Sequence, residues 1–287
     1  MESLFKVLGI APHEVKPNVY SPSDMALKSA VKSKTDYDDT AYPNAYTGQK
    51  WKILVVGSEK DELEMQNGKM FYTGNHPVET FVPLLHLQKA GFDFDFATVN
   101  GNSMKLEMWA MPTEDTYVMS FYTKYKQQIE NPLVLKDVAA NLNNSNYYAV
   151  FIPGGHGALL DLPTDAAMST ILNWTKNENK FLISICHGPA AFLAASTRNK
   201  EDFPYKGYKI TAFNDSMDKI LPTIGYLPGK LTWYFGKKLK DLGITIINKI
   251  PNGSVTVDRN LITGDSPTAA NKLGRLAADT LLQQLSA

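Results

Sequence analysis

The sequence predicts an α/β protein built around a mostly parallel β-sheet that helices cover on both faces. Short apolar runs of strand type alternate with helix-forming segments, and their connections are short, which is the pattern of a parallel sheet. Glycines and reactive side chains follow directly after several of these runs. Because ligands bind beyond the carboxyl ends of parallel strands, we expect these residues to converge on one rim of the sheet.

The charges of the chain are balanced, with 29 Lys and Arg against 29 Asp and Glu in 287 residues. This balance gives no electrostatic reason to expect a specific nucleic-acid site or binding to an anionic membrane. A single cysteine allows no internal disulfide and agrees with a reducing compartment. Residues 1–10 make a poor signal peptide and no run is long enough to span a bilayer, so we expect a cytoplasmic protein.

The first 50 residues predict an extended arm that packs on a core spanning residues 51–287. Ser23 or Asp24 is a plausible N-cap for one short helix in this arm, and a disordered tail is the alternative. The core begins with a buried strand at 52–57, a polar loop at 58–74, a helix from Pro77 to about Lys89, and a half-exposed strand at 92–99.

Residues 100–146 interrupt this alternation and predict a mostly helical insertion. Beyond the insertion the apolar runs predict further elements: strands at 147–152, 181–185, 208–213, 244–247, 254–257 and 260–263, and helices at 164–178, 190–195, 230–242 and 267–285.

Cys186 follows the strand at 181–185 and precedes His187, a Gly-Pro pair and the helix-forming run at 190–195. A nucleophile at a sharp strand-to-helix corner is an elbow, whether it is Ser or Cys. Backbone N–H groups and the helix dipole at that corner are expected to lower the thiol pKa. A buried structural cysteine is the alternative, but the adjoining His187 favours chemistry.

Three more groups of residues are candidates for the same site. Gly154, Gly155 and His156 follow a strand, where glycines let backbone N–H groups point at a ligand; an oxyanion hole suits this loop better than a phosphate loop. Glu79 lies in the first turn of a helix, where it either stabilises the helix dipole or points into the site. Asp215 or Asp218 could orient His187 as the third member of a triad, although Asp is also common in turns.

Four motifs in order resemble one bacterial branch of the PfpI-like superfamily, from about residue 40 onward. They are Asn75-His-Pro-Val-Glu79, Phe151-Ile-Pro-Gly-Gly-His-Gly-Ala158, Ile185-Cys-His-Gly-Pro-Ala190 and Ile262-Thr-Gly-Asp-Ser-Pro267. Members of this branch are heat-shock chaperones also described as glutathione-independent glyoxalase (glyoxalase III) and as protein deglycases. The resemblance implies a flavodoxin-like three-layer sandwich, a small extra domain from the arm and the insertion, and a homodimer.

The resemblance also implies roles for individual residues. Cys186 matches the nucleophile, His187 its adjacent histidine, Glu79 the glutamate that contacts the sulfur, and Asp218 rather than Asp215 the triad acid. Family members can hold zinc through two histidines and an acid, and these positions fall on Gln88, Tyr125 and Asp93. Because Gln and Tyr are poor or rare zinc ligands, we expect no metal at this site, and we expect no other cofactor.

The resulting functional hypothesis is thiol chemistry on small dicarbonyls such as methylglyoxal, which are converted to lactate without glutathione. Deglycation of protein and nucleotide adducts uses the same attack, which would serve the stress response and DNA repair. A cysteine amidase or peptidase is one alternative, because Cys, His and an acid also suit acyl transfer. A holdase chaperone for unfolded proteins is another, and it would need an exposed apolar patch.

Overall fold

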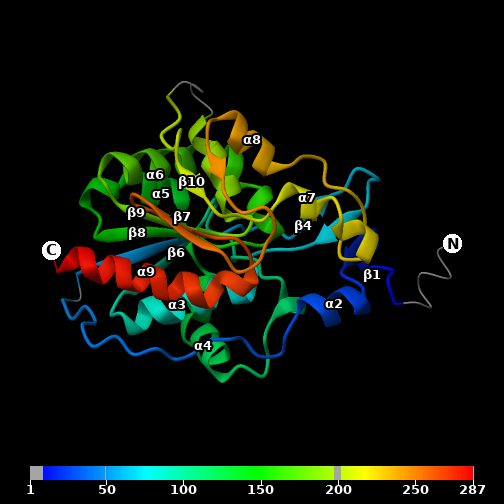
Figure 1. Ribbon diagram of the computed structural model, residues 1–287, viewed down its shortest axis with the longest axis horizontal. Helices are drawn as coiled ribbons and strands as arrows, with labels where there is room; N and C mark the ends of the chain where they lie inside the picture. The colour runs from blue at the N-terminus through cyan, green and yellow to red at the C-terminus, as the bar shows by residue number, and fades with distance from the viewer. Residues whose placement is uncertain (1–8, 49, 197–201, 287) are drawn as a thin grey trace.

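The computed structural model describes residues 9–48, 50–196 and 202–286, and its centre is a seven-stranded sheet in the order β12-β13-β9-β8-β3-β6-β7 (Figure 1). All of its strand pairs are parallel except β12 with β13, so the predicted mostly parallel sheet is confirmed. The strands are β3 (Lys52–Val56), β6 (Asp93–Thr98), β7 (Leu133–Val134), β8 (Tyr147–Ile152), β9 (Phe181–Ile185), β12 (Val255–Asp258) and β13 (Leu261–Gly264).

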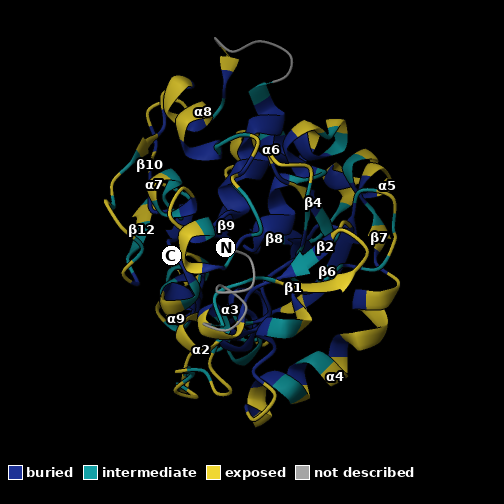
Figure 2. Ribbon diagram, turned by 90° about the vertical axis from the view of Figure 1, so that its right-hand side faces the viewer, coloured by how far each residue is buried: buried dark blue, intermediate teal, exposed yellow. Residues whose placement is uncertain are grey.

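Helices cover both faces of this sheet and complete the three-layer sandwich. On one face lie α3 (Pro77–Lys89), α4 (Thr116–Glu130) and α9 (Ala270–Leu285), and on the other lie α5 (Leu135–Ala140), α6 (Ala166–Asn177) and α8 (Phe235–Asp241) (Figure 1). Alternate residues of β3 supply two separate cores, Ile53 and Val55 to one and Leu54 and Val56 to the other. Figure 2 shows the buried strands between helices whose outer faces are exposed.

A second, four-stranded sheet joins β1 (His13–Lys16), β2 (Val19–Ser21), β5 (Met70–Tyr72) and β4 (Glu62–Glu64). The prediction of a polar loop at 58–74 is therefore wrong, because strands of three residues are too short to show a hydrophobic period. Phe71 nevertheless anchors the sheet, since it is fully buried. The small sheet thus draws its strands from the arm and from residues 58–74, and not from the insertion.

The rest of the arm lies along the core. Its helix α2 (Asp24–Ala30) is capped by Ser23, whose hydroxyl accepts a hydrogen bond from the Ala26 amide (3.2 Å). Further on, the Tyr42 hydroxyl lies 2.8 Å from Nδ1 of His86 on α3. The first eight residues of the predicted arm lie outside the described residues.

Several predicted elements differ in extent from the structure. The insertion at 100–146 contributes the edge strand β7 as well as helices. The strand predicted at 208–213 is only β10 (Lys209–Ile210), which pairs with β11 (Thr245–Ile246). The run after Cys186 forms a 3₁₀ helix, η5 (Gly188–Ser196). The other short helices are η1 (Met108–Ala110), η2 (Leu142–Asn144), η3 (His156–Leu159), η4 (Leu162–Thr164), α7 (Asp215–Asp218), η7 (Leu221–Ile224) and η8 (Pro267–Ala269).

Helix α8 begins at Phe235 and not at the predicted residue 230. Leu231 forms an isolated antiparallel bridge with Met65, which ties this segment to the small sheet. The carboxylate of Asp215 then accepts hydrogen bonds from the amides of Gly236 (2.9 Å) and Lys237 (2.7 Å). Asp215 therefore satisfies amides of the first turn and fixes where the helix begins.

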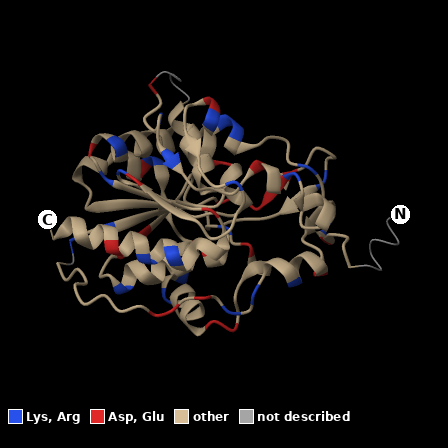
Figure 3. Cartoon of the chain, in the orientation of Figure 1, with Lys and Arg blue, Asp and Glu red and all other residues tan. Residues whose placement is uncertain are grey.

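The surface of the molecule carries both signs of charge. Figure 3 shows Lys and Arg interspersed with Asp and Glu over the helices and loops around the sheet. Within the described residues, no helix combines the length and the apolar character needed to cross a bilayer.

Candidate active site

Cys186 stands at the corner between β9 and η5. Its backbone has a positive φ of 59°, which is uncommon for a residue other than glycine and strains the turn. The corner is held from both sides, since the Cys186 amide donates to Gly264 O (2.9 Å) and its carbonyl accepts from the Phe213 amide (3.0 Å). The sharp strand-to-helix corner expected at Cys186 from the sequence is therefore present in the backbone.

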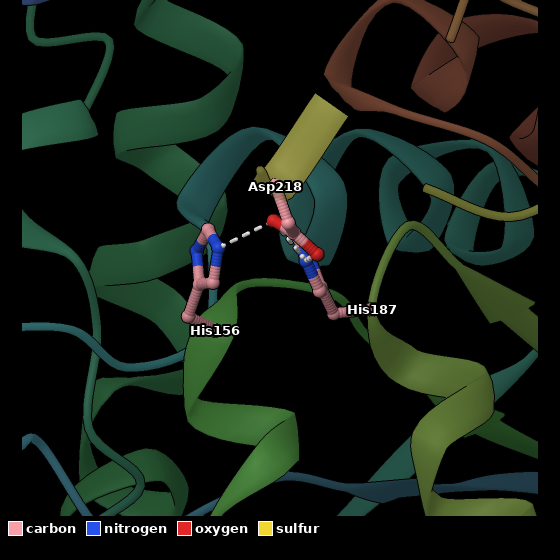
Figure 4. Close-up of side chains that lie close together, drawn as sticks. All are labelled: His156, His187 and Asp218. Atoms are coloured by element: carbon pink, nitrogen blue, oxygen red, sulfur yellow. Dashed lines mark hydrogen bonds and ion pairs between the residues drawn. The ribbon is translucent and has the colours of Figure 1, made fainter. Parts of the chain in front are cut away.

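His187 and Asp218 extend from Cys186 in a line of hydrogen-bonding atoms. Figure 4 shows the part of this line that joins His187 to Asp218. Nδ1 of His187 lies 3.3 Å from the Cys186 sulfur, and Nε2 lies 3.1 Å from both carboxylate oxygens of Asp218. Burial acts to raise the pKa of Asp218, but the two histidines beside it hold that pKa well below its usual range. An ionised carboxylate only accepts, so Nε2–H of His187 donates to it and Nδ1 is left to accept the thiol proton.

Glu79, in the first turn of α3, places its carboxyl group beside the Cys186 thiol and the Gly155 amide. Burial raises the pKa of both Glu79 and Cys186 well above their ordinary values, and the Glu79 charge raises that of the thiol further. The expected lowering of the thiol pKa is therefore wrong, because burial outweighs the Gly155 amide. Burial therefore favours the protonated forms of both groups, and His187 is the neighbouring base that can accept the thiol proton.

The glycine loop passes directly over this pair. A Cβ at Gly154 would lie 2.6 Å from Cβ of Cys186 and 2.7 Å from the Ile185 carbonyl, so only glycine fits there. Gly155 has a φ of +97°, and its amide faces the Cys186 sulfur and Glu79. That amide is placed to stabilise an oxyanion that forms next to the sulfur.

His156 is bound to the acid of the site. Its Nε2 lies 3.1 Å from Oδ1 of Asp218, and its ring centroid lies 4.1 Å from that of His187 (Figure 4). Its backbone amide faces the carboxyl group of Glu107. The His156 ring is thus engaged with Asp218, and the loop amide that faces the nucleophile is that of Gly155.

The structure separates the two candidate acids and adds one that the sequence reasoning missed. Asp218 faces His187, whereas Asp215 caps α8. Glu107, which follows β6 and precedes η1, is 1% exposed and was not predicted as a site residue. The signal that could have found Glu107 is weak, because a single acid before an apolar run is also a common surface residue.

The comparisons with known proteins decide the family. A family model described as the DJ-1/PfpI family matches residues 70–279. The chain belongs to the DJ-1/PfpI family. The protein/nucleic acid deglycase HchA of Escherichia coli O7:K1 is 49% identical over 266 residues, which cover 92% of this chain and 93% of that protein. Protein/nucleic acid deglycase 1 of Escherichia coli K12 matches with the same identity and coverage.

Solved structures of more distant proteins share the DJ-1/PfpI fold. Glyoxalase III of Candida albicans superposes with a TM-score of 0.64 at 21% identity, covering 80% of this chain and 97% of that one. The Rapid Encystment Protein 24 kDa of Francisella tularensis gives a TM-score of 0.66 at 21% identity, covering 80% and 98%. These likenesses confirm the fold predicted from the sequence.

The zinc positions implied by the DJ-1/PfpI resemblance lie together on α3, β6 and α4. Nε2 of Gln88 donates to the Tyr125 hydroxyl (3.0 Å), which in turn donates to Oδ1 of Asp93 (3.2 Å). Burial raises the pKa of Tyr125 to about 12, so the phenol stays protonated at neutral pH. The amide of Gln88, the protonated phenol of Tyr125 and the carboxylate of Asp93 are hydrogen-bonded to one another. Such a set does not fit a zinc ion, because a neutral amide and a protonated phenol are poor zinc ligands.

We therefore expect that treatment with EDTA changes neither the rate nor the melting temperature of the purified protein. Added zinc is expected to inhibit instead, because His156, His187 and Asp218 hold ligand atoms within 4.8 Å of one another and a metal there would displace the hydrogen bond of His187. Stoichiometric zinc in elemental analysis, lost together with stability on chelation, would contradict this prediction.

Proposed function

We propose that this protein is a cysteine-dependent enzyme that detoxifies reactive 1,2-dicarbonyls and removes their early adducts from proteins and nucleotides. The observation that carries the proposal is the buried line from Cys186 through His187 to Asp218, with Glu79 against the sulfur. Deglycation is what the name of the relatives that are 49% identical states. Methylglyoxal is a small 1,2-dicarbonyl that can undergo the same attack.

The reaction begins when His187 takes the thiol proton and the Cys186 sulfur attacks the aldehyde carbon, which forms a hemithioacetal. The Gly155 amide stabilises the oxyanion of this step. Glu79 and His187 are the candidates to move a proton between the two adjacent carbons, which converts the hemithioacetal to a thioester. Water then cleaves the thioester to lactate and restores the thiol. On a glycated protein the sulfur attacks the carbon that is bonded to the amine, thiol or guanidine group of the modified side chain. That side-chain group then leaves as the C–S bond forms.

The burial of the site favours a small substrate over a peptide. The Cys186 side chain is 5% exposed and His187 is 1% exposed. Rings of Phe71, Trp109 and Tyr226 pack against one another next to His156. A peptidase needs a groove that holds several residues of extended chain, whereas a three-carbon dicarbonyl needs only the space beside the sulfur.

The proposal is tested by measuring lactate formed from methylglyoxal in the absence of glutathione, with short amide substrates run in parallel. We expect steady lactate formation and slower turnover of the amides. If the amides are turned over faster than methylglyoxal, the peptidase alternative replaces this proposal.

The proposal also includes the setting in which the enzyme works. We infer a homodimer from the family resemblance and a cytoplasmic location from the single free cysteine. The steps above need only the thiol, acid–base side chains and water, so we infer that the enzyme uses no cofactor. Size-exclusion chromatography with light scattering tests the dimer. A monomer at micromolar concentration would contradict the proposed dimer but would not affect the proposed reaction.

A further inference from the structure

Buried polar atoms without a hydrogen-bond partner are concentrated at one place in the described residues. They are Nδ1 of His76, Oε2 of Glu107 and both carboxyl oxygens of Glu79, which face the Cys186 thiol and the Gly155 amide without meeting hydrogen-bond geometry. Native proteins leave few such groups, since each one costs about 1–3 kcal/mol of desolvation. The His76 amide donates to Gly154 O (2.9 Å), so this set surrounds the glycine loop and indicates a site for a polar ligand.

Glu107 is the member of this set that the proposed mechanism does not use. Its Oε1 accepts a hydrogen bond from the Thr73 hydroxyl (2.7 Å), and its backbone amide donates to Asn75 O (3.0 Å). The carboxyl group is therefore held on one side, while Oε2 is left unpaired on the other. This residue is well fixed, and its Oε2 makes no hydrogen bond of good geometry, with the His156 amide as the donor that faces the carboxyl group.

Two successive amides of the glycine loop face Cys186 and Glu107. The Gly155 amide faces the Cys186 sulfur, and the following amide, that of His156, faces the Glu107 carboxyl. The two N–H groups therefore line the stretch of loop between the sulfur and the carboxyl group. A substrate bound to the sulfur at the first amide therefore extends its neighbouring atoms toward Glu107.

The titratable groups that face Glu107 are Glu79 on α3, His156 on η3 and Tyr226 after η7. Burial raises the pKa of Glu107 to about 7, and it raises that of Glu79 well above the ordinary value. Burial likewise raises the pKa of Tyr226, so this phenol stays protonated. Glu107 is thus the group in this set that exchanges a proton near neutral pH, where general acid–base catalysis is most effective.

We propose that Glu107 binds the second carbonyl oxygen of the substrate and protonates it, which makes the space between Cys186 and Glu107 a subsite for 1,2-dicarbonyls. This inference rests on the proposed function. When the base removes hydrogen from C1 of the hemithioacetal, the electron pair forms the C1–C2 double bond. The C2 carbonyl oxygen then takes the proton of Glu107 to give an enediol. The base next delivers its proton to C2, the C1 hydroxyl proton returns to Glu107, and the thioester remains.

The test is the variant Glu107→Gln, which keeps an oxygen for Thr73 but has no carboxyl proton. We expect kcat for methylglyoxal to fall about 100-fold. In the wild type, kcat should decrease as the pH rises through about 7, because only protonated Glu107 can donate a proton to the substrate. This decrease, the alkaline limb of the pH–rate profile, should be absent in the variant. The matched control is Glu59→Gln, since Glu59 is also buried but its carboxylate is paired with Asn100 and Asn102.

Two results would overturn the role of Glu107. One is a variant that keeps the wild-type rate and the wild-type pH limb. The other is a variant in which the rate of Cys186 alkylation by iodoacetamide falls as much as kcat for methylglyoxal falls. Glu107 would then act on the thiol or the fold and not on the substrate. Melting temperatures of both variants show whether either loss is a folding defect.

A binding experiment separates this inference from the proposed function, because it needs no turnover. Hydroxyacetone keeps the second carbonyl but has no aldehyde, and its affinity is measured on Cys186→Ala by calorimetry. We expect binding about tenfold tighter at about pH 6 than at about pH 8.5, and no such difference in Cys186→Ala/Glu107→Gln. Equal pH dependence in both proteins refutes the subsite. Failure of the wild type to form lactate refutes the proposed function only.

Discussion

Replacement of Cys186 by alanine is expected to lower kcat/KM for lactate formation from methylglyoxal by at least about 10³-fold. In the proposed mechanism the sulfur forms the covalent bond that starts the reaction, and a methyl group cannot replace it. Stability should change by only about 1 kcal/mol, since a small buried side chain is removed and the corner is held by backbone hydrogen bonds. The measurements are lactate release without glutathione and the melting temperature.

The control for this experiment is Cys186→Ser, which keeps the size of the side chain but offers a hydroxyl in place of the thiol. We expect this variant to be nearly as inactive as Cys186→Ala, because a hydroxyl is a much weaker nucleophile at neutral pH. An alanine variant that retains more than about a tenth of the wild-type rate would show that the sulfur is not the nucleophile.

The central sheet could be predicted from the sequence because its strands carry a strong local signal. Apart from Lys52 and Ser184, the residues of β3, β8 and β9 are apolar or aromatic, as is typical of strands buried on both faces. The small sheet could not be predicted, since Glu62–Glu64 and Met70–Tyr72 become strands only by pairing with each other and with Val19–Ser21. Long-range pairing of three-residue segments leaves no periodic pattern.

The site was predictable to the extent that its residues follow strand ends. Cys186 lies where a strand meets a helix, and that corner could be read from composition alone. The protonation states could not be predicted, because they depend on burial and on side chains brought from other elements. The Cys186 thiol has a raised pKa since Glu79 and the surrounding core outweigh the loop amide. Glu107 was missed for the same reason, as only the folded chain shows its free oxygen beside the glycine loop.

The second large effect is expected for Asp218→Asn, which should lower kcat/KM by about 10²–10⁴-fold. Both His187 and His156 donate Nε2–H to the Asp218 carboxylate. An asparagine amide has one oxygen and one NH₂ group, so one of the two imidazoles must face a donor. If that imidazole is His187, its proton moves to Nδ1, which lies 3.3 Å from the Cys186 sulfur and can then no longer accept the thiol proton.

The matched control is Asp215→Asn, which makes the same chemical change three residues earlier in the chain. Among the described residues its carboxylate accepts hydrogen bonds from the amides at the start of α8. Asparagine can accept hydrogen bonds there too, so activity should stay within about threefold. The rate at which iodoacetamide alkylates Cys186 gives a second readout, because it reports thiol deprotonation without any later step. We expect Asp218→Asn to slow alkylation strongly and Asp215→Asn to leave it unchanged. Equal losses in the two variants would show that Asp218 supports the fold of this segment and does not orient His187.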